Sequence, residues 1–163
     1  MRKLLLTIGL VLVLGVAVFA LGTAPAMSGG GAAAATQTSA TTMSASDYYA
    51  AGYKASNAKN WSEAITDFRA AIAAKPDYAE AYNMLGFSLR NAGQIKDAFA
   101  AYDSALKYKP NFPEAREYYG EAYLQMDDLK DAVRQYIVIQ KSGEPAKELL
   151  EKIADYLAAH PGA

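Results

Sequence analysis

Few side chains in this sequence could perform chemistry. The chain has no cysteine, and its single histidine, His160, lies close to the C-terminus. These counts exclude thiolate metal sites, cysteine nucleophiles and a Ser-His-Asp arrangement. Asp127, Asp128 and Asp131 form an acidic cluster that suits a helix start better than calcium, which needs more oxygen ligands. We therefore expect no enzyme, no metal and no cofactor.

A hydrolase that uses paired carboxylates is the enzymatic alternative. Such an enzyme needs one carboxyl group in an apolar cleft, where its pKa is raised. No carboxylate pair in the sequence has an evidently apolar setting. The alternative is therefore the weaker interpretation.

Charge is nearly balanced over the chain but unevenly distributed. There are 16 Lys and Arg against 17 Asp and Glu, and no charged residue lies between Lys3 and Asp47. Nucleic-acid-binding domains usually carry a basic excess. We therefore expect no nucleic-acid partner.

Residues 1–26 have the pattern of an export signal. Arg2 and Lys3 precede an apolar run at residues 4–22, and the small residues Ala24-Pro25-Ala26 follow. Such a segment is removed after export if it is a signal peptide, but a run of this length can also remain as a membrane anchor. Both interpretations place the later residues outside the cytoplasm. The chain is then periplasmic or secreted, or attached to the membrane through residues 4–22.

Residues 27–44 consist almost entirely of Gly, Ala, Ser and Thr and carry no charge. Such a stretch buries too little apolar surface to offset the entropy of ordering it. We expect a flexible linker, with a glycosylated Ser/Thr stalk as the alternative.

The rest of the chain repeats with a period of 34 residues. Glycine, alanine, aromatic and proline positions recur at this spacing, in the columns Gly52, Gly86 and Gly120; Ala64, Ala98 and Ala132; Phe68, Tyr102 and Tyr136; Ala71 and Ala105; Pro76 and Pro110. Each period contains two helical stretches. Residues 95–108 are the clearest, with apolar residues at the spacing of an amphipathic helix.

This pattern resembles the tetratricopeptide repeat (TPR) family, whose signature is W-x2-L-G-x2-Y, then A-x3-F, then Ala and Pro. The second repeat shows Tyr82-x2-Leu85-Gly86-x2-Leu89, followed by Ala98-x3-Tyr102. The third repeat departs from the signature at Arg116. The resemblance implies an all-α solenoid of three helix-turn-helix repeats.

The expected TPR domain spans residues 45–163. Its repeats fall at about 45–78, 79–112 and 113–145, and a capping helix falls at 146–159. The capping helix has an apolar stripe, Ala146, Leu149, Leu150, Ile153 and Leu157, which is expected to pack on the last repeat.

Stacked helix pairs of this family form a concave groove lined by the first helix of each pair. The position after each signature residue lies about 100° further round the helix and is expected to face that groove. The expected partner-binding residues are Tyr49, Tyr53, Asn83, Phe87, Arg90, Glu117 and Glu121, with Glu80 and Glu114 beside them. The alternative for each residue is packing between helices or simple solvation.

The groove residues predict the chemistry of the partner. Asn83 can hydrogen-bond an extended backbone, Phe87 can contact an apolar side chain, and Arg90 can bind a carboxylate. The acidic end of the groove favours a protein or peptide with a basic segment. We therefore expect an extracytoplasmic interaction module or scaffold. The alternative is a structural protein of the cell envelope that associates with itself to form an oligomer.

Overall fold

The structure is a computed structural model that describes residues 43–162. These described residues form one compact unit. The expected export segment, residues 1–26, lies outside the described residues, as does nearly all of the expected linker, residues 27–44. No helix of the described part is long and apolar enough to span a bilayer.

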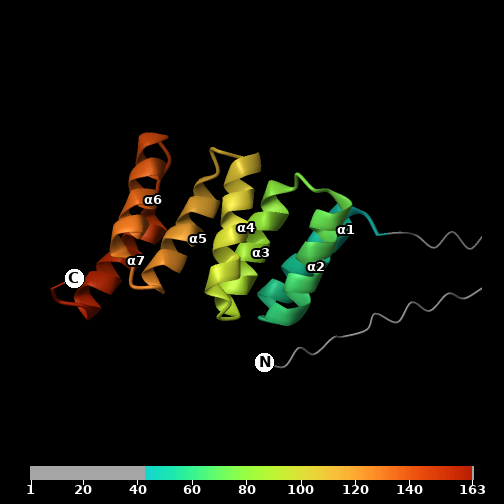
Figure 1. Ribbon diagram of the computed structural model, residues 1–163, viewed down its shortest axis with the longest axis horizontal. Helices are drawn as coiled ribbons and strands as arrows, with labels where there is room; N and C mark the ends of the chain where they lie inside the picture. The colour runs from blue at the N-terminus through green and yellow to red at the C-terminus, as the bar shows by residue number, and fades with distance from the viewer. Residues whose placement is uncertain (1–42, 163) are drawn as a thin grey trace, which may run out of the picture. The chain divides into compact units, whose positions relative to one another are not determined.

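The described residues form seven helices and no strand. The helices are α1 (Ala45–Asn57), α2 (Trp61–Ala74), α3 (Ala79–Asn91), α4 (Ile95–Tyr108), α5 (Pro113–Leu124), α6 (Leu129–Lys141) and α7 (Lys147–Ala159). Consecutive helices form antiparallel pairs that stack side by side along the long axis of the unit (Figure 1). The expected all-α repeat fold is confirmed.

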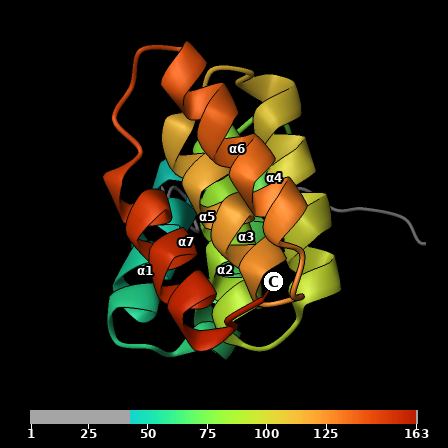
Figure 2. The same ribbon diagram turned by 90° about the vertical axis from the view of Figure 1, so that its left-hand side faces the viewer.

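The stack is curved, with the first helices of the pairs on its inner side. Successive first helices contact each other, α1 with α3, α3 with α5, and α5 with α7. No two of the second helices α2, α4 and α6 are in contact. The first helices are therefore closer together, so that within residues 43–162 they line the concave side. Figure 2 shows α7 to the left of α6, and α5 to the left of α4.

The repeated glycines allow the two helices of a pair to approach closely. A Cβ atom at Gly52 would lie 2.9 Å from the Phe68 ring, and one at Gly86 would lie 2.6 Å from the Tyr102 ring. Both rings are fully buried. Burial of such a side chain stabilises the fold by roughly 1.5–3 kcal/mol. The spacing of glycine and aromatic residues in the sequence therefore corresponds to one packing contact repeated in the first two pairs.

The third pair is packed differently. The nearest side chain to a Cβ atom at Gly120 is Leu149 of α7, at 2.6 Å, rather than Tyr136 of α6. Leu149 is fully buried, whereas Tyr136 is only partly buried. The last helix therefore contributes to the core of the third repeat.

The turns inside the three pairs share one conformation. Lys59, Gly93 and Asp127 all have positive φ, at 58°, 79° and 59°. The next backbone N–H in each turn donates back to the carbonyl five residues earlier, as in the bond from Asn60 to Ala55. This pattern ends a helix through a left-handed residue. Only Gly93 adopts this conformation without a steric cost.

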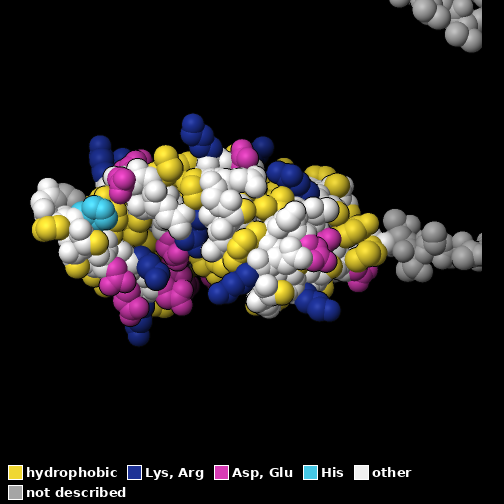
Figure 3. Space-filling view, turned by 90° about the horizontal axis from the view of Figure 1, so that it is seen from below, with side chains coloured by type: hydrophobic (Ala, Val, Ile, Leu, Met, Phe, Trp, Pro, Cys, Tyr) yellow, Lys and Arg dark blue, Asp and Glu magenta, His cyan; other side chains and the backbone are white. Residues whose placement is uncertain are grey.

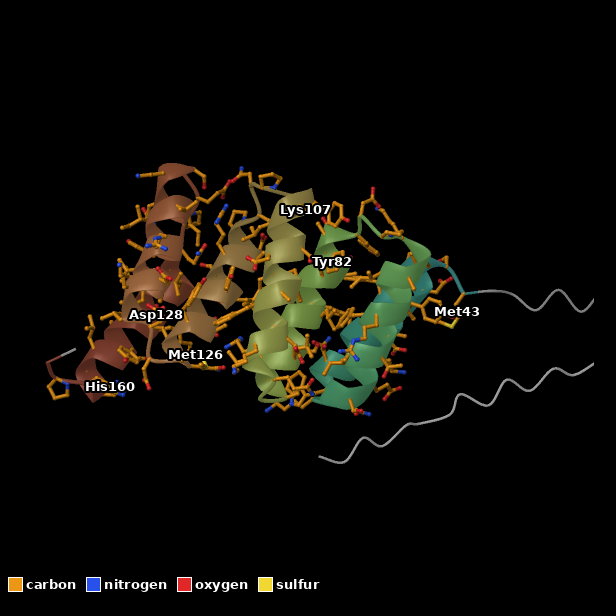
Figure 4. The ribbon with its side chains drawn as sticks, in the orientation of Figure 1. Met43, Tyr82, Lys107, Met126, Asp128 and His160 are labelled. Carbon is orange, nitrogen blue, oxygen red and sulfur yellow. The ribbon has the colours of Figure 1, made fainter. Side chains whose placement is uncertain are left out.

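Two helices begin at residues whose side chains accept backbone hydrogen bonds. The Ser44 hydroxyl accepts from the Asp47 N–H, and the Asp47 carboxylate accepts from the Ser44 N–H, which forms a capping box. The Asp128 carboxylate accepts from the Asp131 N–H at 3.0 Å and caps α6. Figure 4 shows Asp128 in the turn between α5 and α6.

The departure from the signature at Arg116 is accommodated by hydrogen bonds. Its guanidinium donates to the Gln135 Oε1 atom and to the Pro110 carbonyl, both at 3.1 Å. Gln135 lies on α6 and is buried. Arg116 therefore connects the helices of the third pair, at a position that an aromatic residue occupies in the second pair.

The expected apolar stripe of α7 is only partly covered, which corrects the expectation from the sequence. Ala146, Leu149 and Ile153 are buried, but 47% of Leu150 and 43% of Leu157 are exposed. The stripe is wider than the surface that α5 and α6 present to it, because α7 contacts the stack on one flank only.

Candidate partner-binding groove

The N-terminal part of the concave side is aromatic. Tyr49 of α1 is half-buried, and its ring lies 5.2 Å from that of Tyr78 and 5.6 Å from that of Phe68. Tyr53 stacks on Tyr49 at 6.4 Å and is itself 48% exposed. Burial raises the pKa of Tyr49 above its usual value of 10.0. Of this pair, Tyr53 is the more accessible to a partner.

A row of aromatic rings crosses from the first pair to the third. The Phe87 ring of α3 lies 5.9 Å from the Trp61 ring of α2 and 5.0 Å from the Tyr118 ring of α5. All three side chains are half-buried. This row presents a continuous apolar surface that can contact a partner side chain.

Asn83 lies one turn before Phe87 on the same face of α3. It is only 4% exposed, and its carbonyl oxygen Oδ1 has no hydrogen-bond partner. A buried polar atom without a partner costs free energy. A partner N–H that reached this oxygen would remove that cost.

Arg90 and Glu121 form an ion pair between α3 and α5. The Arg90 Nη1 atom lies 2.7 Å from the Glu121 Oε2 atom, with side-chain exposures of 7% and 15%. The guanidinium also lies near the faces of the Phe87 and Tyr118 rings, at 5.6 and 6.0 Å. The sequence suggested that Arg90 binds a carboxylate of the partner. In the structure its carboxylate partner is Glu121 of the same chain.

The ion pair lies against a buried hydroxyl group in the core. Burial raises the pKa of Tyr102, and the nearby Arg90 guanidinium partly offsets this increase. The Tyr102 hydroxyl makes no hydrogen bond of acceptable geometry in the described structure. The ion pair of Arg90 with Glu121 therefore lies beside the neutral hydroxyl group of Tyr102.

The C-terminal part of the concave side is acidic. Glu117 is half-buried, and its pKa is raised by burial and by the negative charges of Glu148, Glu114 and Glu121. Glu148 belongs to α7, so two helices contribute to this cluster. Asp and Glu side chains gather at the lower left of Figure 3, toward the C-terminal helices. A positive charge from a partner would relieve this repulsion.

Two cavities adjoin the acidic residues. One, of about 250 Å³, is lined by Glu117, Pro145, Lys147 and Glu148. The other, of about 440 Å³, is lined by Arg90, Glu121, Leu124, Gln125, Lys152, Asp155 and Tyr156. Both lie against α7, which therefore forms a wall of the groove at this end. Within residues 43–162, no cluster of three potential metal ligands occurs.

Sequence reasoning missed three contributors to this surface. The expected groove set omits Tyr118, which follows Glu117, and the sequence indicates only a packing role for Trp61. Glu148 is absent from the set because its helix was expected only to cap the stack. The carboxylate spacing on α7 offers no signal that this helix approaches Glu117.

The stacked antiparallel helix pairs and their concave side define an all-α helical-repeat protein. Two family models described as tetratricopeptide repeat match the chain, at residues 49–102 and 89–144. Together they extend over three repeats. The chain therefore belongs to the tetratricopeptide repeat family.

Several solved structures resemble the described fold. A crystal structure of MamA is 29% identical with a TM-score of 0.54, and the match covers 69% of this chain and 60% of the MamA chain. PcrH, in complex with the chaperone binding region of PopD, is 23% identical with a TM-score of 0.60, and the match covers 70% of this chain and 88% of PcrH. The TPR2B domain of yeast Sti1 is 18% identical with a TM-score of 0.60, and the match covers 73% of this chain and 100% of that domain. The chain thus spans less than two thirds of MamA. No protein with a curated description matches the chain.

Proposed function

We propose that this chain is an extracytoplasmic protein-protein interaction module, which binds a segment of a partner polypeptide on its concave side. The observation that carries this proposal is the juxtaposition of the aromatic row at Phe87 and Tyr118 with the crowded carboxylates at Glu117 and Glu148. The partner segment carries an apolar side chain and, next to it, Lys or Arg.

The physical roles of the groove residues follow from their surroundings. The aromatic row removes an apolar partner side chain from water. Glu117 and Glu148 attract a cation, and desolvation in the adjoining cavity strengthens that attraction. Arg90 and Glu121 are already paired, so they position the aromatic rings rather than bind the partner.

Related folds support a binding role without catalysis. The TPR2B domain of yeast Sti1 was solved as a complex with pHsp70, and PcrH as a complex with the chaperone binding region of PopD. The tetratricopeptide repeat family is typically an interaction fold rather than an enzymatic one. These likenesses support the class of function; the acidic groove of this chain supports the basic partner.

The proposed location rests on the sequence before residue 27. The cationic start, apolar run and small residues support export, with cleavage after Ala26 or retention of residues 4–22 in the membrane. Intact-mass measurement of the chain from a fractionated cell tests this location. A full-length chain in the soluble cytoplasmic fraction would overturn it.

Peptide display tests the groove. Residues 40–163, which contain every hydrophobic cluster of the described part, serve as the target. We expect enriched peptides with an aromatic or aliphatic residue followed within about three positions by Lys or Arg. Glu117→Lys should weaken their binding at least about tenfold, because it removes an attraction and adds a repulsion.

Asp77→Lys is the matched control, because it makes the same charge change at an exposed loop residue. Phe87→Ala should weaken binding without changing the preference for basic peptides. If Asp77→Lys weakens binding as much as Glu117→Lys, then net charge alone explains the effect and the proposed groove is wrong.

A further inference from the structure

Helix α7 is attached to the stack mainly by apolar contacts. Leu149 is fully buried against Gly120 of α5, and Ile153 is buried in the same hydrophobic cluster. Among the described residues, no ion pair joins α7 to another helix. The hydrogen bond from the Tyr156 hydroxyl to Asp127 is exposed and 3.3 Å long. The docking of α7 on the stack therefore depends mainly on the burial of apolar side chains.

The junction between α5 and α7 lacks the ion pair that joins α3 with α5. Arg90 of α3 pairs with Glu121 of α5 at 2.7 Å. In the repeat register, Leu124 of α5 lies 34 residues after Arg90, and Asp155 of α7 lies 34 residues after Glu121. These four residues line one cavity of about 440 Å³. An apolar residue of α5 thus stands where a cation would be needed to pair α5 with α7.

A repulsive contact lies next to the apolar contact that holds α7. Glu148 precedes Leu149 on α7, and Glu117 lies three residues before Gly120 on α5. Burial raises the pKa of Glu117, and the negative charge of Glu148 raises it further. The contact of Leu149 with Gly120 therefore brings two carboxylates together. Docking of α7 is favoured by the first contact and opposed by the second.

The cavity between the two carboxylates can hold a cation. It has a volume of about 250 Å³ and is lined by Glu117, Pro145, Lys147 and Glu148. The other charged or titratable groups around Glu117 are Glu114, Tyr118 and Glu121 on α5 and Arg90 on α3, which is already paired with Glu121. Carboxylates thus outnumber cations at this junction. An ammonium or guanidinium group in the cavity would contact carboxylates of both α5 and α7.

We propose that a cation of the bound partner joins α7 to α5, so that binding in the groove and docking of α7 are coupled. The partner's Lys or Arg supplies the positive charge that Leu124 does not, and it replaces the repulsion between Glu117 and Glu148 by an attraction to both. Binding and docking then favour each other by the same factor. This inference rests on the proposed function of the groove and adds a conformational response of α7 to it.

Hydrogen exchange of α7 with and without a peptide tests the coupling. The probe is the capped peptide acetyl-Gly-Ser-Phe-Ser-Lys-Gly-amide, added at millimolar concentration to residues 40–163. Its control carries Gln in place of Lys. We expect the Lys peptide to slow exchange of the α7 amides at least about threefold and to slow those of α1 less. The Gln peptide should slow exchange of α7 less than the Lys peptide does.

Two substitutions on α7 separate coupling from direct contact with the peptide. Leu149→Ala removes a fully buried side chain that the peptide cannot touch, yet it should weaken binding of the Lys peptide at least about threefold, because α7 docks less often. Leu157→Ala, at an exposed position of the same helix, should leave the affinity unchanged. Slow exchange of α3 and α4 checks that Leu149→Ala remains folded, and Ile153→Val is the milder substitution if it does not.

Glu148→Gln should have opposite effects on docking and on binding. Without peptide it should slow exchange of α7, because it removes the repulsion from Glu117. It should also weaken binding of the Lys peptide, because it removes a carboxylate from the cavity. Asp77→Asn, which removes one negative charge from an exposed loop, should have neither effect.

The possible outcomes distinguish this inference from the proposed function. Peptide binding without slower exchange of α7, or binding that Leu149→Ala leaves unchanged, overturns the coupling and leaves the groove as the binding site. Unchanged exchange of α7 in Glu148→Gln also overturns it, because the carboxylates would then not oppose docking. Absence of peptide binding contradicts the proposed function and the coupling together.

Discussion

Among single residues, close packing decides which positions tolerate change. Gly86 and Gly120 occupy the same place in successive repeats, and a Cβ atom at either would meet a neighbour at 2.6 Å. At Gly86 the neighbour is the buried ring of Tyr102, and at Gly120 it is the end of the Leu149 side chain. A closely packed aromatic ring can shift less than the end of a leucine side chain, which can change its rotamer.

We therefore expect Gly86→Ala to lower the free energy of unfolding by about 1–3 kcal/mol, the usual cost of overpacking. Gly120→Ala should cost less, because the Leu149 side chain can adjust. The preference of the helix for alanine over glycine, roughly 1 kcal/mol, is common to both variants. Urea denaturation of both variants measures the difference. An equal or larger loss for Gly120→Ala would contradict this account of the two contacts.

Glu117 offers a prediction about pH. Its pKa in the folded state is raised above its usual value of 4.5, so its negative charge is less favourable there than in the unfolded chain. The group therefore contributes most to stability below pH 4.5, and that contribution is lost as the pH rises through the folded pKa. Glu117→Gln should be more stable than the parent at pH 7 and equally stable below about pH 4.

Chemical denaturation over this pH range tests the prediction. Asp77→Asn, which removes one negative charge from an exposed loop, controls for net charge. A stabilisation by Glu117→Gln that persists unchanged at about pH 4 would show that the burial of the Glu117 charge and its repulsion by Glu148, Glu114 and Glu121 are not its source.

Among the helices, α7 is held by one side of its apolar stripe. Leu149 is fully buried against Gly120, whereas Leu157 on the same helix is 43% exposed. Both residues are leucines on the same helix. A difference in stability between their alanine variants therefore reports their difference in burial.

Leu149→Ala should lower the free energy of unfolding by about 2–5 kcal/mol, because it leaves a cavity in the core. Leu157→Ala should change it by about 0.5 kcal/mol or less, as is usual for an exposed position. Thermal or urea denaturation compares the two. Similar losses of stability in the two variants would mean that α7 packs on the stack in another orientation.

Across the whole described unit, stability is distributed along the stack. One hydrophobic cluster runs through α1 to α5, and a second joins the end of α5 with α6 and α7. Helix α7 packs against α5 and α6 only. In stacked repeats each unit is stabilised by its neighbours, so a helix at the end has fewer stabilising contacts.

Hydrogen exchange should show this gradient. We expect the amides of α3 and α4 to exchange most slowly and those of α7 much faster, through local opening of the C-terminal end. Mass spectrometry of peptides from each helix makes the comparison. Equal protection of α7 and α3 would show that the described unit opens only as a whole.

The helix pairs and their order could be predicted from the amino-acid sequence without coordinates. The 34-residue spacing of Gly52 with Gly86 and of Phe68 with Tyr102 reflects contacts between helices that are adjacent in the chain. Patterns of this kind are visible in a sequence because helix periodicity and turn geometry are set by nearby residues.

The burial of the expected groove residues could not be predicted in this way, and neither could the contacts that they make with other helices. The spacing on α3 placed Asn83, Phe87 and Arg90 on one face, but the ion pair of Arg90 with Glu121 and the approach of Glu148 to Glu117 join separate helices. Such contacts depend on the angle and distance at which helices pack, and no short stretch of sequence specifies these. The exposure of Leu150 and Leu157 has the same origin, since it depends on which helices lie beside α7.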